Sequence, residues 1–555
     1  MFLKSTTSKG NTYLQIVQSY RENNEIKHKV IANLGRLDTL LANGLENIVK
    51  SLNKYLPNKE NPNKLDITTL EEKERVNYGY IVYKTLWEKY SITELLKSLI
   101  KNKRIKYELI EIVFSLVINR LLEPSSKLYH YNHRQHYLAT DNESQLHDIY
   151  RSLKVLSDNK EEIQKDIFEK NKNLFNMKVD IVLYDVTTFH YESQKVDELR
   201  NYGFSKANKI NEVQVVMGLL VDTEGRPIGY ELFSGNTFDG KTMIKVLQKL
   251  KEKYELNQII IVADKGLNSK INLKEIKEAG FDYIVSARIK NMTKKVQEEI
   301  ISENDYEKIE TGKEEEVYKY KVIDHEYKFN YEEKDKDEKI IAREKISLTE
   351  KLVCTYSSLR ARKDKNDRLR GIEKAQKVIE CQDVSYLNKK KGFKRYIKEE
   401  GKEEKKKILK LDMGKINNEE RFDGYYAIQY SKIDMSPLEV INKYHSLYKV
   451  EESFRILKTT METRPIYLRN KEHIEGHFVI CFIAFLLERE LELRLKNQEI
   501  EYSAEKIKEA LNSLEFSKIE IEAQIFYMKS KCQSLASKIM ECLRIKKPSN
   551  LLSES

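Results

Sequence analysis

The sequence predicts an α/β protein built around a mixed β-sheet, and three stretches carry this prediction. VDIVLYD at 179–185 and QIIIVAD at 258–264 are short apolar runs that each end on an aspartate. Runs of this kind are typical of buried parallel strands. Between them, EVQVVMGLLVD and RPIGYELF flank the turn DTEG, which indicates an antiparallel meander.

Helical patterns complete the order of these central elements. We predict a helix from about Gly240 to Tyr254, a second helix around 272–279, and a last strand around 281–287. The order β-β-β-α-β-α-β is that of a ribonuclease-H-like core, in which the first and fourth strands are parallel neighbours. Asp185 and Asp264 then stand side by side at strand ends, where α/β sheets bind their ligands.

Residue patterns and local composition divide the rest of the 555 residues into further segments. A basic β-hairpin from Thr12 to Leu34 and a short helix are expected to precede a linker at 56–64. The helical pattern that follows fits a scaffold and a DNA-binding domain equally well. A stretch dense in Lys and Glu favours a β-rich insertion over partial disorder. The expected segments are 1–65 (hairpin and helix), 66–176 (helical), 177–290 (core, first part), 291–422 (charged insertion), 423–496 (core, second part) and 497–555 (C-terminal domain, with one strand around 518–528 between helices).

Charge and cysteine content limit the class of protein. Lys and Arg number 99 against 88 Asp and Glu, a formal net charge of +11, which favours a polyanionic partner. An A+T-rich genome would explain the same lysine content. The five scattered cysteines form no CxxC pair, so the cytoplasm is the expected location. The apolar run at 478–487 is too short for a bilayer and predicts a buried helix, so no membrane is expected.

A third carboxylate position comes from the stretch 436–458, which predicts one amphipathic helix. Ser436 is a predicted N-cap, with Pro437 at the first helical position and a capping box closed three residues later. Tyr444, Glu451 and Lys458 are spaced by seven and therefore share one face of such a helix. Taken alone, Glu451 is more simply a solvated surface charge.

Together, Asp185, Asp264 and Glu451 predict a metal site. Three carboxylates converge only around a cation, and an all-oxygen ligand set matches Mg²⁺ or Mn²⁺. Two such ions would support an in-line displacement at phosphorus, so phosphodiester chemistry is the implied reaction class. Arg455 and Lys458 would suit phosphate contacts, and Tyr444 would orient a phosphate or stack on a base. The simpler alternative for Arg455 is an ion pair with Glu451 one turn away.

Other polar residues in these stretches have structural interpretations. Thr187 and Thr188 are expected to satisfy backbone groups at a strand end, and Asp222 to stabilise a hairpin turn. Asn236 with Asp239 is expected to shape a turn. The nearby histidines His130, His133 and His136 have no carboxylate or cysteine in ligand register, so no metal site is expected there.

The joint pattern resembles the DDE transposases of bacterial insertion sequences. The matching motifs are YDVTTFHYES around Asp185, GFSKANK from Gly203, SGNTFDGKT from Ser234, VADKGLNS around Asp264, and Y-x2-L-x3-E-x6-K from Tyr444. The last is similar to the YREK motif, Y-x2-R-x3-E-x6-K, of the insertion-sequence-four superfamily. The resemblance is specific over 179–288 and 422–487 and looser near the N-terminus, around YREN to NLGRL.

This resemblance implies a ribonuclease-H-like catalytic core with a β-rich insertion before the catalytic glutamate. The implied metal-binding triad is Asp185, Asp264 and Glu451, while Tyr444 and Lys458 fall on the Tyr and Lys of the motif. Its arginine position is Leu447 here, which leaves open the hairpin intermediate that the motif serves in relatives. The implied DNA contacts are Tyr444, Arg455, Lys458, Arg464 and Arg469.

The implied function is a transposase that binds the terminal inverted repeats of its element, cleaves the ends and transfers the 3′-hydroxyls to target DNA. Double-stranded DNA is then the partner, a homodimer pairs two ends, and the bound protein is nucleoid-associated. Two alternatives remain open. One is a metal-dependent nuclease or recombinase on the same core, and the other is an inactive derivative retained as a regulatory DNA-binding protein.

Overall fold

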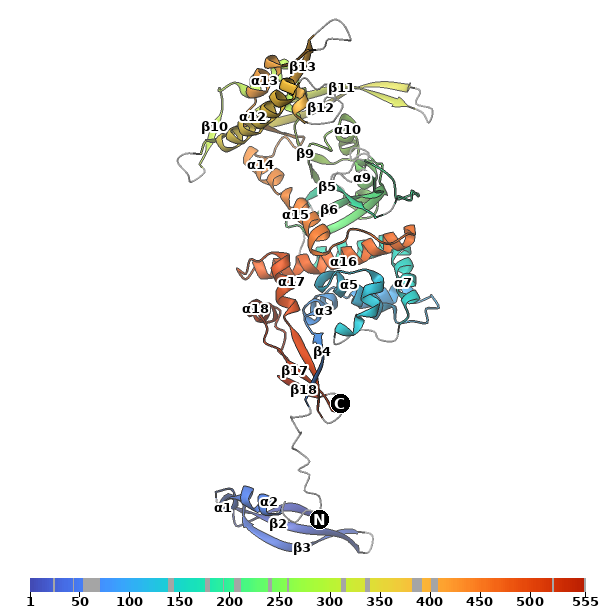
Figure 1. The fold of residues 1–555 in the computed structure, drawn as a ribbon, viewed down its shortest axis with the longest axis vertical. Helices are drawn as coiled ribbons and strands as arrows, with labels where there is room; N and C mark the ends of the chain where they lie inside the picture. The colour runs from blue at the N-terminus through green and yellow to red at the C-terminus, as the bar shows by residue number, and fades with distance from the viewer. Residues whose placement is uncertain are drawn as a thin grey trace. The chain divides into compact units, whose positions relative to one another are not determined.

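The computed structural model divides the chain into two compact units (Figure 1). One consists of residues 1–74, 518–528 and 551–555, and the other of residues 75–517 and 529–550. The structure describes residues 1–22, 25–42, 44–52, 70–137, 144–174, 180–192, 194–203, 211–237, 242–256, 259–310, 316–334, 340–381, 392–400, 408–521 and 524–553. The predicted linker at 56–64 and Asp239 lie outside the described residues.

The N-terminal sheet has three antiparallel strands in the order β1-β2-β3. The predicted hairpin is confirmed as β2 and β3, and β1 is a strand that the sequence analysis did not predict. Lys9 and Gly10, both with positive φ, form the two-residue turn between β1 and β2. The elements are β1 (Phe2–Ser8), β2 (Asn11–Glu22), β3 (Glu25–Arg36), α1 (Leu37–Ala42) and α2 (Leu45–Leu52).

A nine-stranded sheet in the order β10-β11-β12-β15-β9-β8-β5-β6-β7 forms the centre of the second unit. Its core strands and helices follow the predicted order β-β-β-α-β-α-β, and β5 and β8 are parallel neighbours as predicted. The fold is therefore ribonuclease-H-like. The elements are β5 (Ile181–His190), β6 (Gln214–Val221), β7 (Pro227–Ser234), α9 (Met243–Glu252), β8 (Ile260–Ala263), α10 (Lys270–Glu278) and β9 (Asp282–Ser286).

The predicted end of the first core strand at Asp185 is wrong. Strand β5 runs on to His190 because β6 pairs with it over that whole second half, from Leu183↔Val221 to His190↔Gln214. What ends near Asp185 is the parallel pairing with β8, whose last pair is Tyr184↔Ala263. The edge of the parallel pair, and not the end of the strand, therefore defines the position of Asp185.

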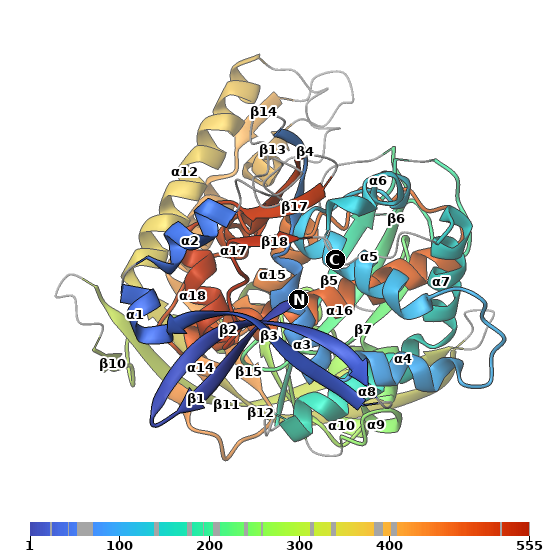
Figure 2. The ribbon, with the colours of Figure 1, turned by 90° about the horizontal axis from the view of Figure 1, so that it is seen from below.

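The segment 291–422 extends the core sheet and contains more helix than its β-rich pattern predicts. The long strands β11 and β12 join the core because β12 pairs with β15, which in turn pairs with β9. Figure 2 shows α12 as the longest helix of this segment. The elements are α11 (Lys294–Ile301), β10 (Glu307–Ile309), β11 (Tyr318–Lys334), β12 (Ile340–Ser357), α12 (Ser358–Cys381), β13 (Ile397–Glu400), β14 (Ile408–Leu411), α13 (Met413–Glu420) and β15 (Tyr425–Tyr430).

Helices α3 to α8 and α16 (Lys471–Lys496) make up the helical part of the second unit, and α16 is its buried helix. Residues 478–487 are all buried, which confirms the buried helix predicted there. Helices α3, α5 and α7 pack against it. Within the described residues, no helix is long and apolar enough to cross a membrane. The other helices are α3 (Tyr80–Lys89), α4 (Ile92–Ile100), α5 (Leu109–Leu122), α6 (Lys127–Asn132), α7 (Leu146–Asp158) and α8 (Lys160–Leu174).

Two predictions at the borders of this helical part are wrong. Residues Glu71–Asn77 form a strand, β4, because they pair in a sheet of order β18-β17-β16-β4 with strands from the end of the chain. The single strand predicted around 518–528 is two strands. The C-terminal elements are α17 (Ala504–Asn512), β16 (Glu515–Ile521), β17 (Gln524–Lys529), α18 (Ser534–Cys542) and β18 (Leu551–Ser553).

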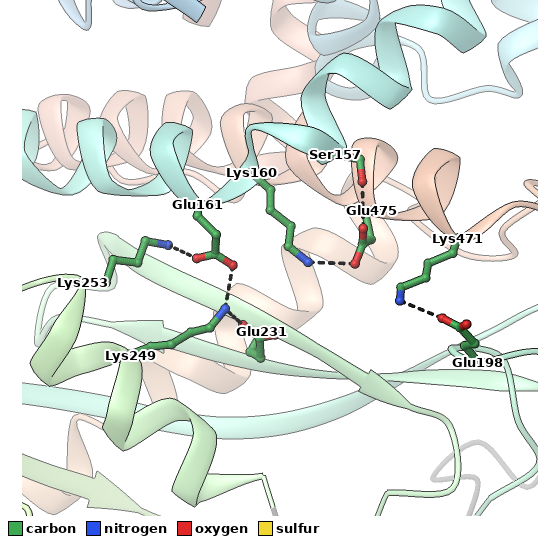
Figure 3. Close-up of polar contacts among 9 residues, drawn as sticks. All are labelled: Ser157, Lys160, Glu161, Glu198, Glu231, Lys249, Lys253, Lys471 and Glu475. Carbon is green, nitrogen blue, oxygen red and sulfur yellow. Dashed lines mark hydrogen bonds and ion pairs between the residues drawn. The ribbon is translucent and has the colours of Figure 1, made fainter.

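Ion pairs join the helical part to the core (Figure 3). Glu161 of α8 accepts hydrogen bonds from Lys249 of α9 at 2.6 Å and from Lys253, just after α9, at 2.7 Å. Burial raises the pKa of Glu161, but the two lysines outweigh it and lower that pKa to about 2. Glu475 of α16 is held by Lys160 at 2.7 Å. Figure 3 also shows the bond from Ser157 to Glu475, the bond from Lys249 to Glu231, and the separate pair of Lys471 with Glu198.

Gly476 lets α16 approach α7 closely, which predicts a stability change. A Cβ at Gly476 would lie 2.0 Å from the carbonyl oxygen of Leu153. We expect Gly476→Ala to lower the free energy of unfolding by about 1–3 kcal/mol because the two helices must separate. The measurement is urea unfolding followed by circular dichroism.

The matched control is Gly414→Ala, because Gly414 is also helical and a Cβ there has only Asp412 within 4 Å, at 3.5 Å. This variant is expected to be neutral or slightly stabilising. Equal stability of the two alanine variants would contradict the close helix contact at Gly476.

Candidate active site

Two aspartates stand at the same edge of the parallel strand pair. Asp185 follows Tyr184 on β5, and Asp264 follows Ala263 of β8, and these two preceding residues are partners in the parallel register. Asp185 is half-buried and Asp264 is exposed. Because neighbouring strands are about 4.8 Å apart, the register places the two backbones side by side. The register therefore puts Asp185 and Asp264 at neighbouring backbone positions.

The stretch 436–458 is not the single helix that was predicted. It forms α14 (Pro437–His445), α15 (Tyr448–Arg455) and a π-helical turn at Ile456–Thr460. The break occurs where Leu447 N bonds to Tyr444 O at 3.1 Å and Lys449 N to Ser446 O at 2.9 Å. These bonds span three residues and interrupt the four-residue ladder of an α-helix. The predicted N-cap is confirmed, since Ser436 Oγ accepts from Glu439 N at 3.3 Å.

Both halves of this broken helix pack on the strands that carry the aspartates. Helix α14 contacts β8 and β9, and α15 contacts β5 and β6 (Figure 1). Glu451 is exposed in the first turn of α15. Lys458, in the π-helical turn, donates to Thr187 Oγ1 on β5. The role predicted for Thr187, at a strand end, is therefore wrong, because it sits within β5 and bonds the lysine.

A chain of hydroxyl groups leads to Asp264. The hydroxyl of Tyr444 donates to Asp264 Oδ1 at 3.4 Å, and that of Tyr426 lies 2.6 Å from both Tyr444 Oη and Ser286 Oγ. Burial, with the neighbouring Tyr426 and Asp264, raises the pKa of Tyr444, so its hydroxyl stays protonated and remains a donor. Tyr426 is not among the predicted site residues, and its signal in the sequence is its place in the apolar run FDGYYAI.

The remaining predicted DNA contacts occupy different environments. Arg455 is exposed on α15, and Arg469 is exposed just before α16. Arg464 is half-buried and lines a cavity in the helical part. Leu447, at the arginine position of the motif, is only 7% exposed and begins α15. An arginine there would bury its charge in this conformation, so the leucine fits the turn that it occupies.

Glu452, the neighbour of Glu451, is not a simple surface charge. It is half-buried and pairs with Lys449 and with Arg489 of α16, each at 3.1 Å. Arg489 also pairs with Glu492 at 2.9 Å. Burial raises the pKa of Glu492, and the charges of Arg489 and Lys449 oppose this rise. This ion-pair network fixes α15, and with it the backbone of Glu451, to the buried helix.

The structural residues behave largely as predicted. Asp222 accepts from the backbone of Glu224 at 2.9 Å and Arg226 at 2.8 Å within its turn. His130 is buried against Ser115 at 2.8 Å, and burial lowers its pKa to about 3. Neither residue belongs to the site.

The carboxylates of the site match a divalent cation by chemistry but are not gathered around one. Across the described ranges, no group of three or more His, Cys, Asp or Glu side chains is close enough together to hold a metal ion. Asp185, Asp264 and Glu451 supply only oxygen donors, and no sulfur or imidazole lies among them. Such a donor set suits Mg²⁺ or Mn²⁺.

A ribonuclease-H-like sheet with acidic residues on adjacent strands defines a class of enzymes that act on phosphodiesters. Comparison with protein families specifies this class. The family described as "Transposase DDE domain" matches residues 177–487, more than half of the chain. The chain belongs to the DDE transposases and is a DDE transposase enzyme. The family described as "IS1634 family transposase, N-terminal domain" matches residues 3–63.

No curated protein matches the chain. Among solved structures, the chain is similar to piggyBac transposase, seen in a synaptic complex with hairpin DNA, with 9% identity and a TM-score of 0.34 over 80% of this chain and 82% of that one. It is also similar to Mos1 transposase, in a paired-end complex with the left transposon end, with 12% identity and a TM-score of 0.14 over 33% and 59% of the two chains.

The bond between Tyr426 and Tyr444 predicts a change in DNA cleavage. Tyr426→Phe removes the hydroxyl that bonds Tyr444, so Asp264 loses part of its support. Because one such bond contributes about 1 kcal/mol, we expect DNA strand cleavage to slow about fivefold. The control is Tyr425→Phe. The hydroxyl that this variant lacks donates to Ile301 O at 3.3 Å and to Glu303 at 3.2 Å instead of to Tyr444. Equal rates for the two phenylalanine variants would argue against this role for Tyr426.

Proposed function

We propose that this transposase binds the terminal inverted repeats of its own insertion sequence, cleaves the element ends and transfers their 3′-hydroxyls to target DNA. The observation that carries the proposal is the parallel register of β5 and β8, which brings Asp185 and Asp264 to one edge. Glu451 is carried by α15, which packs against β5 and β6. These three residues are the proposed catalytic residues.

The proposed cofactor is a pair of Mg²⁺ or Mn²⁺ ions held by Asp185, Asp264 and Glu451. Bound there, the ions would activate the attacking oxygen and stabilise the leaving oxygen in an in-line displacement at phosphorus. The chain's own residues orient these ligands. Tyr444 donates a hydrogen bond to Asp264, and the network of Glu452 and Arg489 fixes the helix of Glu451.

The proposed DNA contacts are Tyr444, Arg455, Lys458, Arg464 and Arg469. Their support is position, since Tyr444 and Lys458 reach Asp264 and Thr187 beside the carboxylates. A net charge of +11 favours a phosphate-rich partner. We further propose a homodimer in the DNA complex, because transposition pairs two element ends. In the cell, this protein would act in the cytoplasm at the nucleoid.

The test uses duplexes that carry an element end, incubated with Mg²⁺ and the full chain. Asp185→Asn, Asp264→Asn and Glu451→Gln are each expected to abolish strand cleavage and transfer, because each removes one anionic oxygen ligand. Binding of the duplex, measured by gel shift, is expected to persist. Chelation of the metal with EDTA is expected to have the same effect on the wild type.

Glu439→Ala is the matched control, since it removes a half-exposed carboxylate of α14 that pairs with Lys443. Its cleavage rate is expected to equal that of the wild type. Full cleavage by any of the three site variants would refute the assignment of that residue. Cleavage without transfer would favour a nuclease, and binding without cleavage by the wild type would favour a regulatory derivative.

A further inference from the structure

A cavity of about 750 Å³ lies in the helical part of the second unit. One wall is the connection from α5 to α6, and the other is the segment 462–468 that follows the π-helical turn. Arg120, Lys127 and His477 line it together with Arg464. A cavity of this volume is in the range of small-molecule and nucleotide sites.

Two cations are buried at this cavity. Lys127 is 6% exposed and Arg120 is 5% exposed. In the part of the chain that the structure describes, Lys127 Nζ has no hydrogen-bond partner. Arg120 donates to backbone carbonyl oxygens of Met461 and Glu462, each at 3.3 Å, and these acceptors carry no charge. Burying a cation without an anion is costly, so both cations would be stabilised by an anionic ligand.

Titration of the surrounding groups agrees with this view. Burial and the charge of Arg120 lower the pKa of Lys127 to about 7, so a bound anion would be needed to favour its charged form. Burial also lowers the pKa of His477 well below its ordinary value, so this imidazole is neutral and adds no charge. Two carboxylates, Glu123 and Glu462, line the cavity as well, against three basic side chains. Of these two, Glu462 is exposed and Glu123 half-buried. The buried charge at the cavity is positive.

The outer wall is apolar and aromatic. Tyr129, Tyr150 and Tyr467 line it, and Tyr129 stacks on His133 with ring centroids 4.0 Å apart. Tyr129 and Tyr467 are exposed, so aromatic rings border the cavity on its solvent side. Buried cations beside exposed aromatic rings are the combination that recognises a phosphate attached to a base or sugar.

The cavity is linked to the strand that carries Asp185. Its segment 462–468 continues from the turn of Lys458, and Ile466 N bonds to His190 O, at the end of β5, at 3.4 Å. We propose that the cavity is a phosphate-binding site in which Lys127 neutralises the bound anion. The phosphate belongs to a DNA strand or to a free anion. The flexible stem of a lysine allows its ammonium group to turn to such a ligand. The inference depends on the buried cations alone and does not require strand transfer.

The test compares thermal unfolding of the full chain as wild type, Lys127→Met and Lys97→Met. Lys97 is an exposed lysine of α4, so its variant is the control for loss of one positive charge. The probes are inorganic phosphate and an oligothymidylate without terminal phosphates, each against chloride at equal ionic strength. Wild type and Lys97→Met are expected to unfold at a higher temperature with a probe. Lys127→Met is expected to bind at least about tenfold more weakly.

Without any probe, Lys127→Met is expected to unfold at or above the wild-type temperature, because it removes a buried cation that has no partner. A lysine with a purely structural role would give the opposite result. Stabilisation by the oligothymidylate alone identifies a DNA backbone phosphate, and stabilisation by inorganic phosphate alone identifies a free anion. Stabilisation by both supports the shared phosphate chemistry.

The proposal is overturned if neither probe stabilises the wild type or if Lys127→Met responds as the wild type does. Should Lys127→Met fail to fold, Arg464→Met decides the matter, since Arg464 is half-buried and lines the cavity. Weaker stabilisation of this variant by the effective probe supports the site. An unchanged response of Arg464→Met in that case overturns it.

Discussion

The parallel pairing of β5 with β8 is the constraint on which the rest of the second unit depends. Parallel neighbours cannot be joined by a tight turn, so the chain makes β6, β7 and α9 before it returns as β8. The pairing stops one residue before both Asp185 and Asp264, and two like charges therefore share one edge. Asp264 is exposed and accepts a hydrogen bond from Tyr444, and both solvent and this bond favour its charged form.

The third carboxylate is positioned by a helix that is held at several points. Lys458 donates a hydrogen bond to Thr187 on β5. Arg489 of α16 pairs with Glu452, the residue next to Glu451. Residues seven apart share a face only in a continuous α-helix. The breaks at Leu447 and in the π-helical turn therefore change the angles about the helix axis between Tyr444, Glu451 and Lys458. Tyr444 and Lys458 nevertheless both reach core strands. The tertiary contacts, more than the seven-residue spacing, therefore define which residues face the sheet.

Much of this fold could be predicted from local patterns. The apolar runs that end on Asp185 and Asp264 have the composition of buried parallel strands, and 478–487 is apolar on all sides of its helix, as a buried helix must be. The neighbouring backbone positions of the two aspartates along the parallel pair could therefore be predicted, although β5 continues beyond Asp185.

Other features depend on contacts that no local pattern reports. Strand β4 is polar and becomes a strand only through pairing with the end of the chain. The break at Leu447 follows from three-residue hydrogen bonds that compete with an otherwise regular helical pattern. Tyr426 was missed because its partners, Ser286 and Tyr444, are distant in sequence. The buried cations Lys127 and Arg120 lie in a segment whose pattern predicts only helices.

Strand β15 has a mechanical consequence for the segment inserted before it. It pairs with β12 on one side and with β9 on the other, and its Tyr426 lies opposite Thr355 of β12. Main-chain hydrogen bonds therefore connect the long β11–β12 hairpin, through β15, to β9, which is the neighbour of β8. Six residue pairs, from Lys351↔Tyr430 to Tyr356↔Tyr425, join the base of this hairpin to β15. A movement of the base of the hairpin would therefore also move Tyr426, which contacts Tyr444, and through it Asp264.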